Sequence, residues 1–130
     1  MKIRVINSKE DIETLKTNDK IIHLAFRPST KDIMTLVSRC PSVKAIHVPN
    51  SYRKTMSESI QMFLIIQKVA LLEGDVWGNR TDINKHYEIP KELISVIKEL
   101  KGNNVSTEDI ISYVRDTKLS ADLVRFILNS

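Results

Sequence analysis

The feature that most constrains this fold is a repeat of three short apolar segments in the N-terminal part of the chain. Each segment carries one ionisable residue at what looks like the same place: His23 in the first, His47 in the second and Glu73 in the third. The intervals of 24 and 26 residues match the length of one strand followed by one helix. Strands that alternate with helices pair in parallel through right-handed crossovers. The repeat therefore predicts an α/β fold built from β/α units.

The 130 residues are enough for one domain with a sizeable core. We expect a three- to four-stranded parallel sheet in residues 1–78 and a small helical subdomain in residues 79–130, packed together as one compact unit. Pro90, Ser106 and Ser120 precede apolar periodic segments, so the subdomain is expected to hold about three helices.

The prediction of a fourth strand depends on where the preceding helix ends. A helix is expected to start near Ser51, and its dense apolar stretch 62–66 predicts that it is well buried. We expect this helix to stop near Gln67, with a strand at 70–76; the alternative is a helix that continues to a capping glycine, Gly74. The first three strands are expected at residues 2–6, 21–26 and 43–48.

Composition sets the class of protein. Hydrophobic residues make up 42% of the chain and charged residues 28%, which is typical of a soluble globular protein. No segment approaches the ~18 apolar residues of a membrane helix, so no membrane partner is expected. The single cysteine, Cys40, excludes an internal disulfide and provides no metal motif. A cytoplasmic location is the default expectation.

The charge is unevenly distributed along the chain. Residues 1–74 hold 12 Lys and Arg against 7 Asp and Glu, whereas residues 75–130 hold 8 against 9. Any general attraction to polyanions is therefore expected from the N-terminal part.

Strand alternation predicts which side chains share a face of the sheet. Arg4, His23, His47 and Glu73 are expected on one face, with neighbouring strands ~4.8 Å apart if the strand order is 1-2-3-4. A 2-1-3-4 order would separate these groups. The opposite face is expected to hold Ile3 and Val5, Ile22 and Leu24, Ile46 and Val48, and Leu72 and Val76.

Two interpretations of this ladder are open. His23, His47 and Glu73 have the residue types of a two-His-one-carboxylate metal site or of an acid–base pair, which would make the protein an enzyme. The favoured alternative is a polar ladder with its hydrogen bonds satisfied, either buried beneath the C-terminal helices or partly solvated. Whether the chain is an enzyme stays open, and the cofactor stays unknown.

The strand ends give the leading functional hypothesis, because parallel sheets bind ligands at the carboxyl ends of their strands. Arg27 and Arg53 suit phosphate, and Ser29 and Ser51 with their backbone N–H groups would complete the cradle. The sequence thus predicts non-enzymatic binding of an anionic ligand, a nucleic acid or a phosphate-bearing small molecule such as a nucleotide. The alternative is that the serines are ordinary helix caps and the arginines pair with acids. Trp77 would stack on the ligand, and the full expected set is Arg27, Ser29, Asn50, Ser51, Arg53, Asp75, Trp77 and Arg80.

A third hypothesis concerns the C-terminal part. Residues 105–111 and 119–125 have the rhythm of a helix-turn-helix. The would-be recognition helix offers only Arg125, opposed by Asp122, so the motif looks degenerate for DNA binding. The remaining alternative is a protein-interaction module in which the helical tail or a sheet edge mediates homo-oligomerisation.

Three segments, 23–29, 40–52 and 71–78, together resemble a family of small uncharacterised proteins from methanogenic archaea. The resemblance covers the whole chain. It implies an archaeal, cytoplasmic setting and carries no assigned activity, but it falls on the same strand ends that the physical argument selects.

Overall fold

The computed structural model of the chain describes residues 2–74, 86–114 and 119–129. Within these residues, five strands form one sheet with the order β4-β3-β2-β1-β5. Strands β1 to β4 are parallel, and β5 is antiparallel to β1. The predicted α/β fold with a parallel sheet is confirmed. The strands are β1 (Lys2–Ile6), β2 (Ile21–Leu24), β3 (Ala45–Val48), β4 (Ala70–Glu73) and β5 (His86–Glu88).

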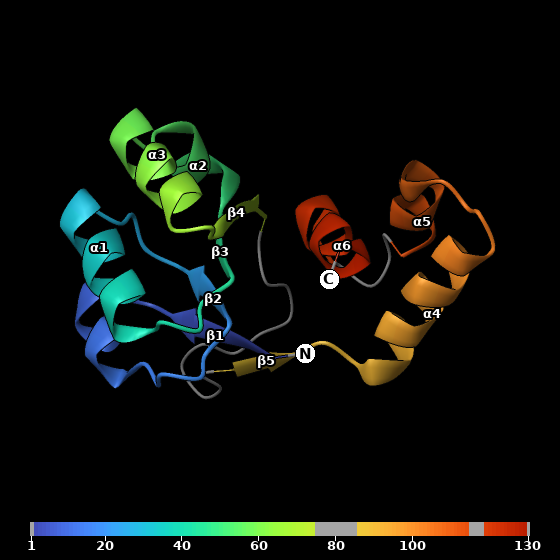
Figure 1. The fold of residues 1–130 in the computed structure, drawn as a ribbon, viewed down its shortest axis with the longest axis horizontal. Helices are drawn as coiled ribbons and strands as arrows, with labels where there is room; N and C mark the ends of the chain where they lie inside the picture. The colour runs from blue at the N-terminus through green and yellow to red at the C-terminus, as the bar shows by residue number, and fades with distance from the viewer. Residues whose placement is uncertain (1, 75–85, 115–118, 130) are drawn as a thin grey trace.

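Helices cover both faces of the sheet, as Figure 1 shows. The helices of the β/α units lie on one side, and the three C-terminal helices lie on the other. The predicted helical C-terminal subdomain is therefore confirmed. The helical elements are η1 (Lys9–Thr14, a 3-10 helix), α1 (Thr30–Arg39), α2 (Asn50–Lys54), α3 (Glu58–Ile66), α4 (Lys91–Gly102), α5 (Thr107–Tyr113) and α6 (Ala121–Leu128).

Two hydrophobic cores follow from this layering. Ile22 and Ile46 are fully buried in the core beneath α1 and α3. Ile3, on the other face of the sheet, is fully buried with Ile97 and Ile127 of the C-terminal helices. Burying one such side chain stabilises a fold by about 1.5–3 kcal/mol, so these shared cores hold the C-terminal helices on the sheet.

The predicted faces are wrong for two of the parallel strands. Val5 is the register partner of His23, and Leu72 is the register partner of His47. Because register partners in parallel strands share a face, Glu73 belongs to the face opposite the two histidines, and so does the arginine of β1. Both faces are covered by helices, so apolar residues occur on both and alternation does not distinguish them. A shift of one residue then exchanges the faces.

The helix expected from Ser51 is in fact two helices. α2 ends at Lys54, and α3 begins after Ser57, whose hydroxyl accepts a hydrogen bond from the Ile60 N–H at 3.2 Å. This serine caps a new helix, so the expected single helix is wrong at residues 55–57. Ser8, in contrast, precedes the 3-10 helix η1, and its side chain forms no cap hydrogen bond.

The predicted fourth strand is confirmed. α3 stops at Ile66, and Lys68 takes a left-handed conformation with φ of 60°, which turns the chain into β4. The expected end of this strand near Val76, and the boundary at residue 78, lie outside the described residues.

The antiparallel edge strand β5 was not expected from the sequence. Tyr87 is the register partner of Ile3, so β5 forms by pairing with the edge of β1. A strand of three residues in a polar segment has too little pattern of its own to be recognised.

No helix in the described ranges has the length and apolar composition that crossing a membrane requires.

Candidate functional site

A cavity of about 330 Å³ opens at the carboxyl edge of the sheet, between the loop after β2 and the loop that joins α2 to α3. This is the edge at which parallel α/β sheets bind ligands. Arg27 and Ser29 of the expected set line it. Among the described residues, the lining is Arg27, Pro28, Ser29, Thr30, Tyr52, Thr55, Met56, Ser57 and Ile60.

The N-terminus of α1 forms one wall of the cavity. Ser29 caps this helix by accepting a hydrogen bond from the Asp32 N–H at 3.1 Å, and the Asp32 carboxylate accepts from the Ser29 N–H at 2.9 Å. Ser29 is therefore an ordinary helix cap, as the alternative interpretation held. The carboxylate already satisfies one donor and offsets part of the positive helix end, but the N–H groups of Thr30 and Lys31 have no partner within the helix.

The N-terminus of α3 forms a second wall. Ser57 caps it and lines the same cavity as Ser29. The N-termini of two helices therefore line the same cavity, and each has N–H groups without a partner in its helix and a partial positive charge. Glu58 in the first turn of α3 opposes this charge.

Arg27 provides the full positive charge at the cavity. Its guanidinium donates a hydrogen bond to the Thr55 hydroxyl and lies 5.1 Å from the centre of the Tyr52 ring. The guanidinium has five N–H donors, so these contacts orient it and leave donors for a carboxylate or phosphate.

The other expected ligand-binding residues are not brought to the cavity wall. Asn50 and Ser51 are exposed in the first turn of α2. Arg53 is partly exposed in the last turn of that helix. α2 has only five residues, so its own N-terminus is a weak dipole. The last three expected residues, Asp75, Trp77 and Arg80, lie outside the described residues.

Sequence reasoning missed Thr55 and Ser57 as cavity residues. The signal was available, because Ser57 stands three residues before Ile60 at the start of an apolar periodic stretch. It was hidden by the assumption of one continuous helix. Tyr52 lines the cavity and contacts Arg27.

The second group of candidates, the histidines, forms a direct pair inside the protein. His23 and His47 are register partners in β2 and β3, and their Nδ1 atoms are 2.8 Å apart. Both side chains are buried, with 4% and 0% exposed. At this distance one Nδ1 must carry hydrogen and donate while the other accepts.

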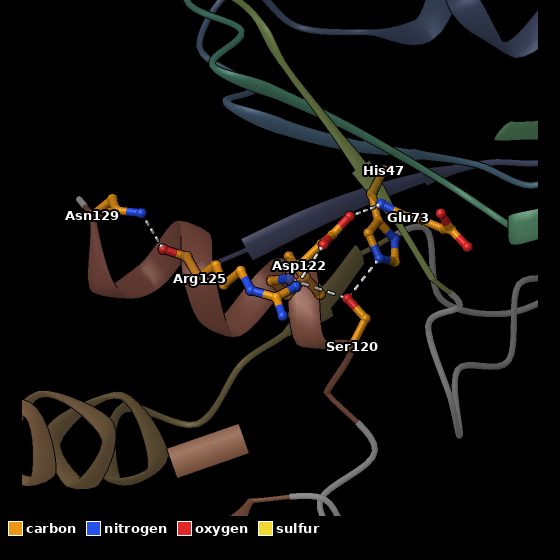
Figure 2. A network of polar contacts seen from close by, with 7 residues as sticks. His47, Glu73, Ser120, Asp122, Arg125 and Asn129 are labelled. Atoms are coloured by element: carbon orange, nitrogen blue, oxygen red, sulfur yellow. Dashed lines mark hydrogen bonds and ion pairs between the residues drawn. The ribbon is translucent and has the colours of Figure 1, made fainter. Parts of the chain in front are cut away.

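His47 extends this contact to the C-terminal helices. Its Nε2 lies 3.1 Å from the hydroxyl of Ser120, which caps α6 and accepts from the Leu123 N–H. Figure 2 shows Ser120 directed at the imidazole from the end of α6. Gly74 permits this approach: it has φ of 147°, and a Cβ there would lie 2.9 Å from His47 Nε2. Only glycine suits such a position.

Burial determines the charge of this pair. Desolvation, with a smaller contribution from the neighbouring His23, lowers the pKa of His47 from 6.5 to about 3. His47 is therefore neutral at physiological pH. Both tautomers are compatible with its two contacts: Nδ1 accepts while Nε2 donates, or the reverse.

Glu73 does not join the histidine pair through register. Its backbone N–H donates to the Asp122 carboxylate of α6 at 2.7 Å (Figure 2). The described residues contain no group of three His, Cys, Asp or Glu side chains suited to a metal ion. Two nitrogens on one tetrahedral zinc would also be separated by about 3.3 Å, so the 2.8 Å between the rings fits a hydrogen bond better. His23 and His47 thus form a hydrogen-bonded polar pair, but the expected four-residue ladder is wrong, because Arg4 and Glu73 lie on the opposite face of the sheet.

Comparison with known protein families identifies the family of this chain. Residues 2–85 match the family described as "Family of unknown function (DUF1699) N-terminal domain". The chain belongs to the DUF1699 family. The match confirms the resemblance to a family without an assigned activity, and the archaeal setting stays a prediction. No curated protein and no solved structure matches the chain.

A second DUF1699 description covers residues 92–129: "Protein of unknown function (DUF1699) C-terminal HTH domain". This span contains α4, α5 and α6, and it agrees with the helix-turn-helix pattern in the sequence. In this DUF1699 chain, α6 would be the recognition helix. Its buried residues face the sheet and the other two helices, and its first turn is bound to the end of β4 through Asp122.

Proposed function

We propose that this DUF1699-family protein binds an anionic ligand, either a nucleotide or the backbone of a nucleic acid, at the carboxyl edge of its parallel sheet. The observation that carries the proposal is that Arg27 and the cap residues of two helices, Ser29 and Ser57, line the same cavity. Helix N-termini and an arginine are the groups that proteins use to hold phosphate.

The size and lining of the cavity support a small phosphate ester. A volume of about 330 Å³ is at the lower end of the range for small-molecule sites. The apolar wall from Met56 and Ile60 would contact the uncharged part of the ligand. The lining contains no His, Cys, Asp or Glu among the described residues, so binding is the proposed role rather than catalysis.

Arg27 would contact the phosphate, with the N–H groups at the starts of α1 and α3 completing the cradle. Ser29 and Ser57 would position those N–H groups through their caps, and each hydroxyl, which accepts from its own helix, keeps its O–H to donate to the ligand. The Tyr52 ring would act through Arg27 by holding the guanidinium plane.

The remaining residues of the expected set would serve a longer ligand. Arg53 lies in the last turn of α2, and Asn50 and Ser51 lie in its first turn. A nucleic-acid strand that leaves the cavity would reach them, whereas a mononucleotide would not. Asp75, Trp77 and Arg80 stay candidates for the same extended contact.

The test is a binding comparison of Arg27→Ala with Arg39→Ala. Arg39 is an exposed arginine that donates to the Glu13 carbonyl, away from the cavity lining, so it controls for loss of one positive charge. Isothermal titration calorimetry measures the binding of nucleoside mono-, di- and triphosphates. Fluorescence anisotropy measures the binding of labelled single-stranded and duplex oligonucleotides.

We expect Arg27→Ala to weaken binding about tenfold to a hundredfold, the worth of a hydrogen bond to a charged group. With oligonucleotides it should also lower the salt slope by about one. Arg39→Ala should leave both quantities nearly unchanged. Equal effects of the two substitutions would show that only net charge matters and would remove the cavity as the site. Arg53→Ala then separates the ligands, since it should weaken oligonucleotides and spare mononucleotides.

A second candidate function is DNA binding through the C-terminal helices, favoured by the description of residues 92–129 as an HTH domain. Two contacts argue against direct reading by α6. Its cap residue Ser120 is held by His47, and Arg125 forms an ion pair with Asp122 at 3.1 Å. Arg125→Ala in the duplex titration tests this candidate, because a reading helix would lose affinity on removal of its exposed cation.

A further inference from the structure

The outer surface of α3 is unusually apolar for an exposed helix. Ile60 and Leu64 are buried against the sheet, as the sequence predicts. Met62, Ile65 and Ile66, in contrast, are 56%, 67% and 69% exposed, so the expectation of a well-buried helix is wrong at these three positions. A helix that is apolar all round is normally covered on every side. We call these three side chains the α3 outer face.

The neighbouring helix widens this surface. Met34 of α1 is 50% exposed and, like Met62 in α3, is the fifth residue of its helix. α1 and α3 pack side by side on the same face of the sheet (Figure 1), so Met34 adds exposed apolar surface on the helix beside α3. Contiguous apolar surface of this kind marks interaction sites.

We propose that the α3 outer face pairs with the same face of a second copy of the chain, with the two α3 helices antiparallel about a two-fold axis. The axis would pass near residue 64. Met62 of each copy would then face Ile66 of the other, and the Ile65 side chains would lie beside the axis.

Charge complementarity selects this occupant. Glu58 begins α3 and Lys68 follows its end, both are exposed, and no hydrogen bond or ion pair links either side chain to another described residue. Antiparallel pairing brings Glu58 of one copy within about 3 Å, along the helix axis, of the position of Lys68 in the other. A parallel arrangement would oppose like charges. An anionic membrane would attract only the lysine end and would repel the glutamate end.

The extent of the surface sets the expected strength. α3 has nine residues and is therefore about 14 Å long. The contact rests mainly on this one short helix, whereas a standard interface takes ~800 Å² from each partner. We therefore expect a dimer that forms reversibly, with a dissociation constant on the order of micromolar.

Sedimentation equilibrium of the full chain over a wide concentration range tests the proposal. The wild type should shift from monomer to dimer. Ile66→Glu should raise the dissociation constant at least tenfold, because it places two carboxylates in the contact. Tyr113→Glu on α5 is the matched control, since Tyr113 is also 69% exposed but lies on another part of the surface; it should dimerise like the wild type. Circular dichroism confirms that each variant is folded.

A charge exchange tests the antiparallel geometry. Glu58→Lys and Lys68→Glu should each weaken the dimer severalfold, and the double variant should recover most of the loss. Failure of the double variant to recover would overturn the antiparallel arrangement. A wild type that stays monomeric, or an Ile66→Glu variant that dimerises normally, would overturn the proposal. A monomer that co-sediments with anionic vesicles would assign the face to a membrane instead.

Discussion

Acid should destabilise this protein through His47, and replacing that residue with glutamine should remove most of the effect. In the folded protein the pKa of His47 is lowered to about 3, whereas its ordinary value is 6.5. Between these values the unfolded chain binds a proton that the folded chain excludes. Stability is therefore fully present above about pH 6.5 and is lost as the pH falls toward 3.

The size of the effect follows from linkage. One titrating group changes the free energy of unfolding by at most about 1.4 kcal/mol per pH unit. Between pH 7.5 and pH 4.5 the lowered pKa of His47 corresponds to a loss of about 3 kcal/mol. A domain of this size has a total stability of about 5–15 kcal/mol, so the loss is a substantial fraction of it.

Urea unfolding at a series of pH values measures this loss. With a slope of about 1–3 kcal/mol per molar urea, the wild-type midpoint should fall by more than about 1 M over that pH range. His47→Gln should be less stable at neutral pH, because it disturbs the contacts to His23 and Ser120, but its midpoint should depend less on pH. The two stability curves should therefore converge in acid.

The double variant with His23→Gln and His47→Gln removes any new titration of the partner ring. A constant gap between wild type and variants from neutral to acid pH would refute the reasoning, because it would mean that His47 contributes packing without excluding a proton.

Two further predictions concern the junction between the sheet and α6. Gly74→Ala should destabilise the fold by about 2–4 kcal/mol, since the added Cβ meets Ser120 in a backbone conformation that favours glycine. The control, Gly102→Ala, should be neutral or slightly stabilising, because a Cβ there meets nothing within 4 Å. Thermal unfolding of both variants compares the two effects. Asp122→Ala should lower the free energy of unfolding by about 1–3 kcal/mol, because it leaves the N–H at the end of β4 without its partner. The control, Asp109→Ala, removes an acid in the first turn of α5 and should lower it by less than about 1 kcal/mol. Equal losses of stability in chemical unfolding would contradict the proposed strength of the Asp122 contact.

The candidate site was only partly predictable. The rule that ligands gather at strand carboxyl ends selected Arg27 and Ser29, which line the cavity. It also selected Arg53, which does not. The difference is the break at residues 55–57, which starts a second helix and brings Ser57 to the cavity. Local cap preferences are strong enough to start a helix, but sequence alone does not show whether an earlier helix has already ended.

The sequence by itself determined the β/α repeat and the parallel pairing, because spacing and crossover handedness leave few alternatives. The order of the strands, which places His23 beside His47, came from the tertiary structure. Only the tertiary structure decided which face each strand presents, since both faces are buried and a shift of one residue exchanges them. It also decided that α6 begins against His47, through a contact between residues 73 positions apart. Such contacts depend on how separate elements pack, and the local pattern of neither segment records them.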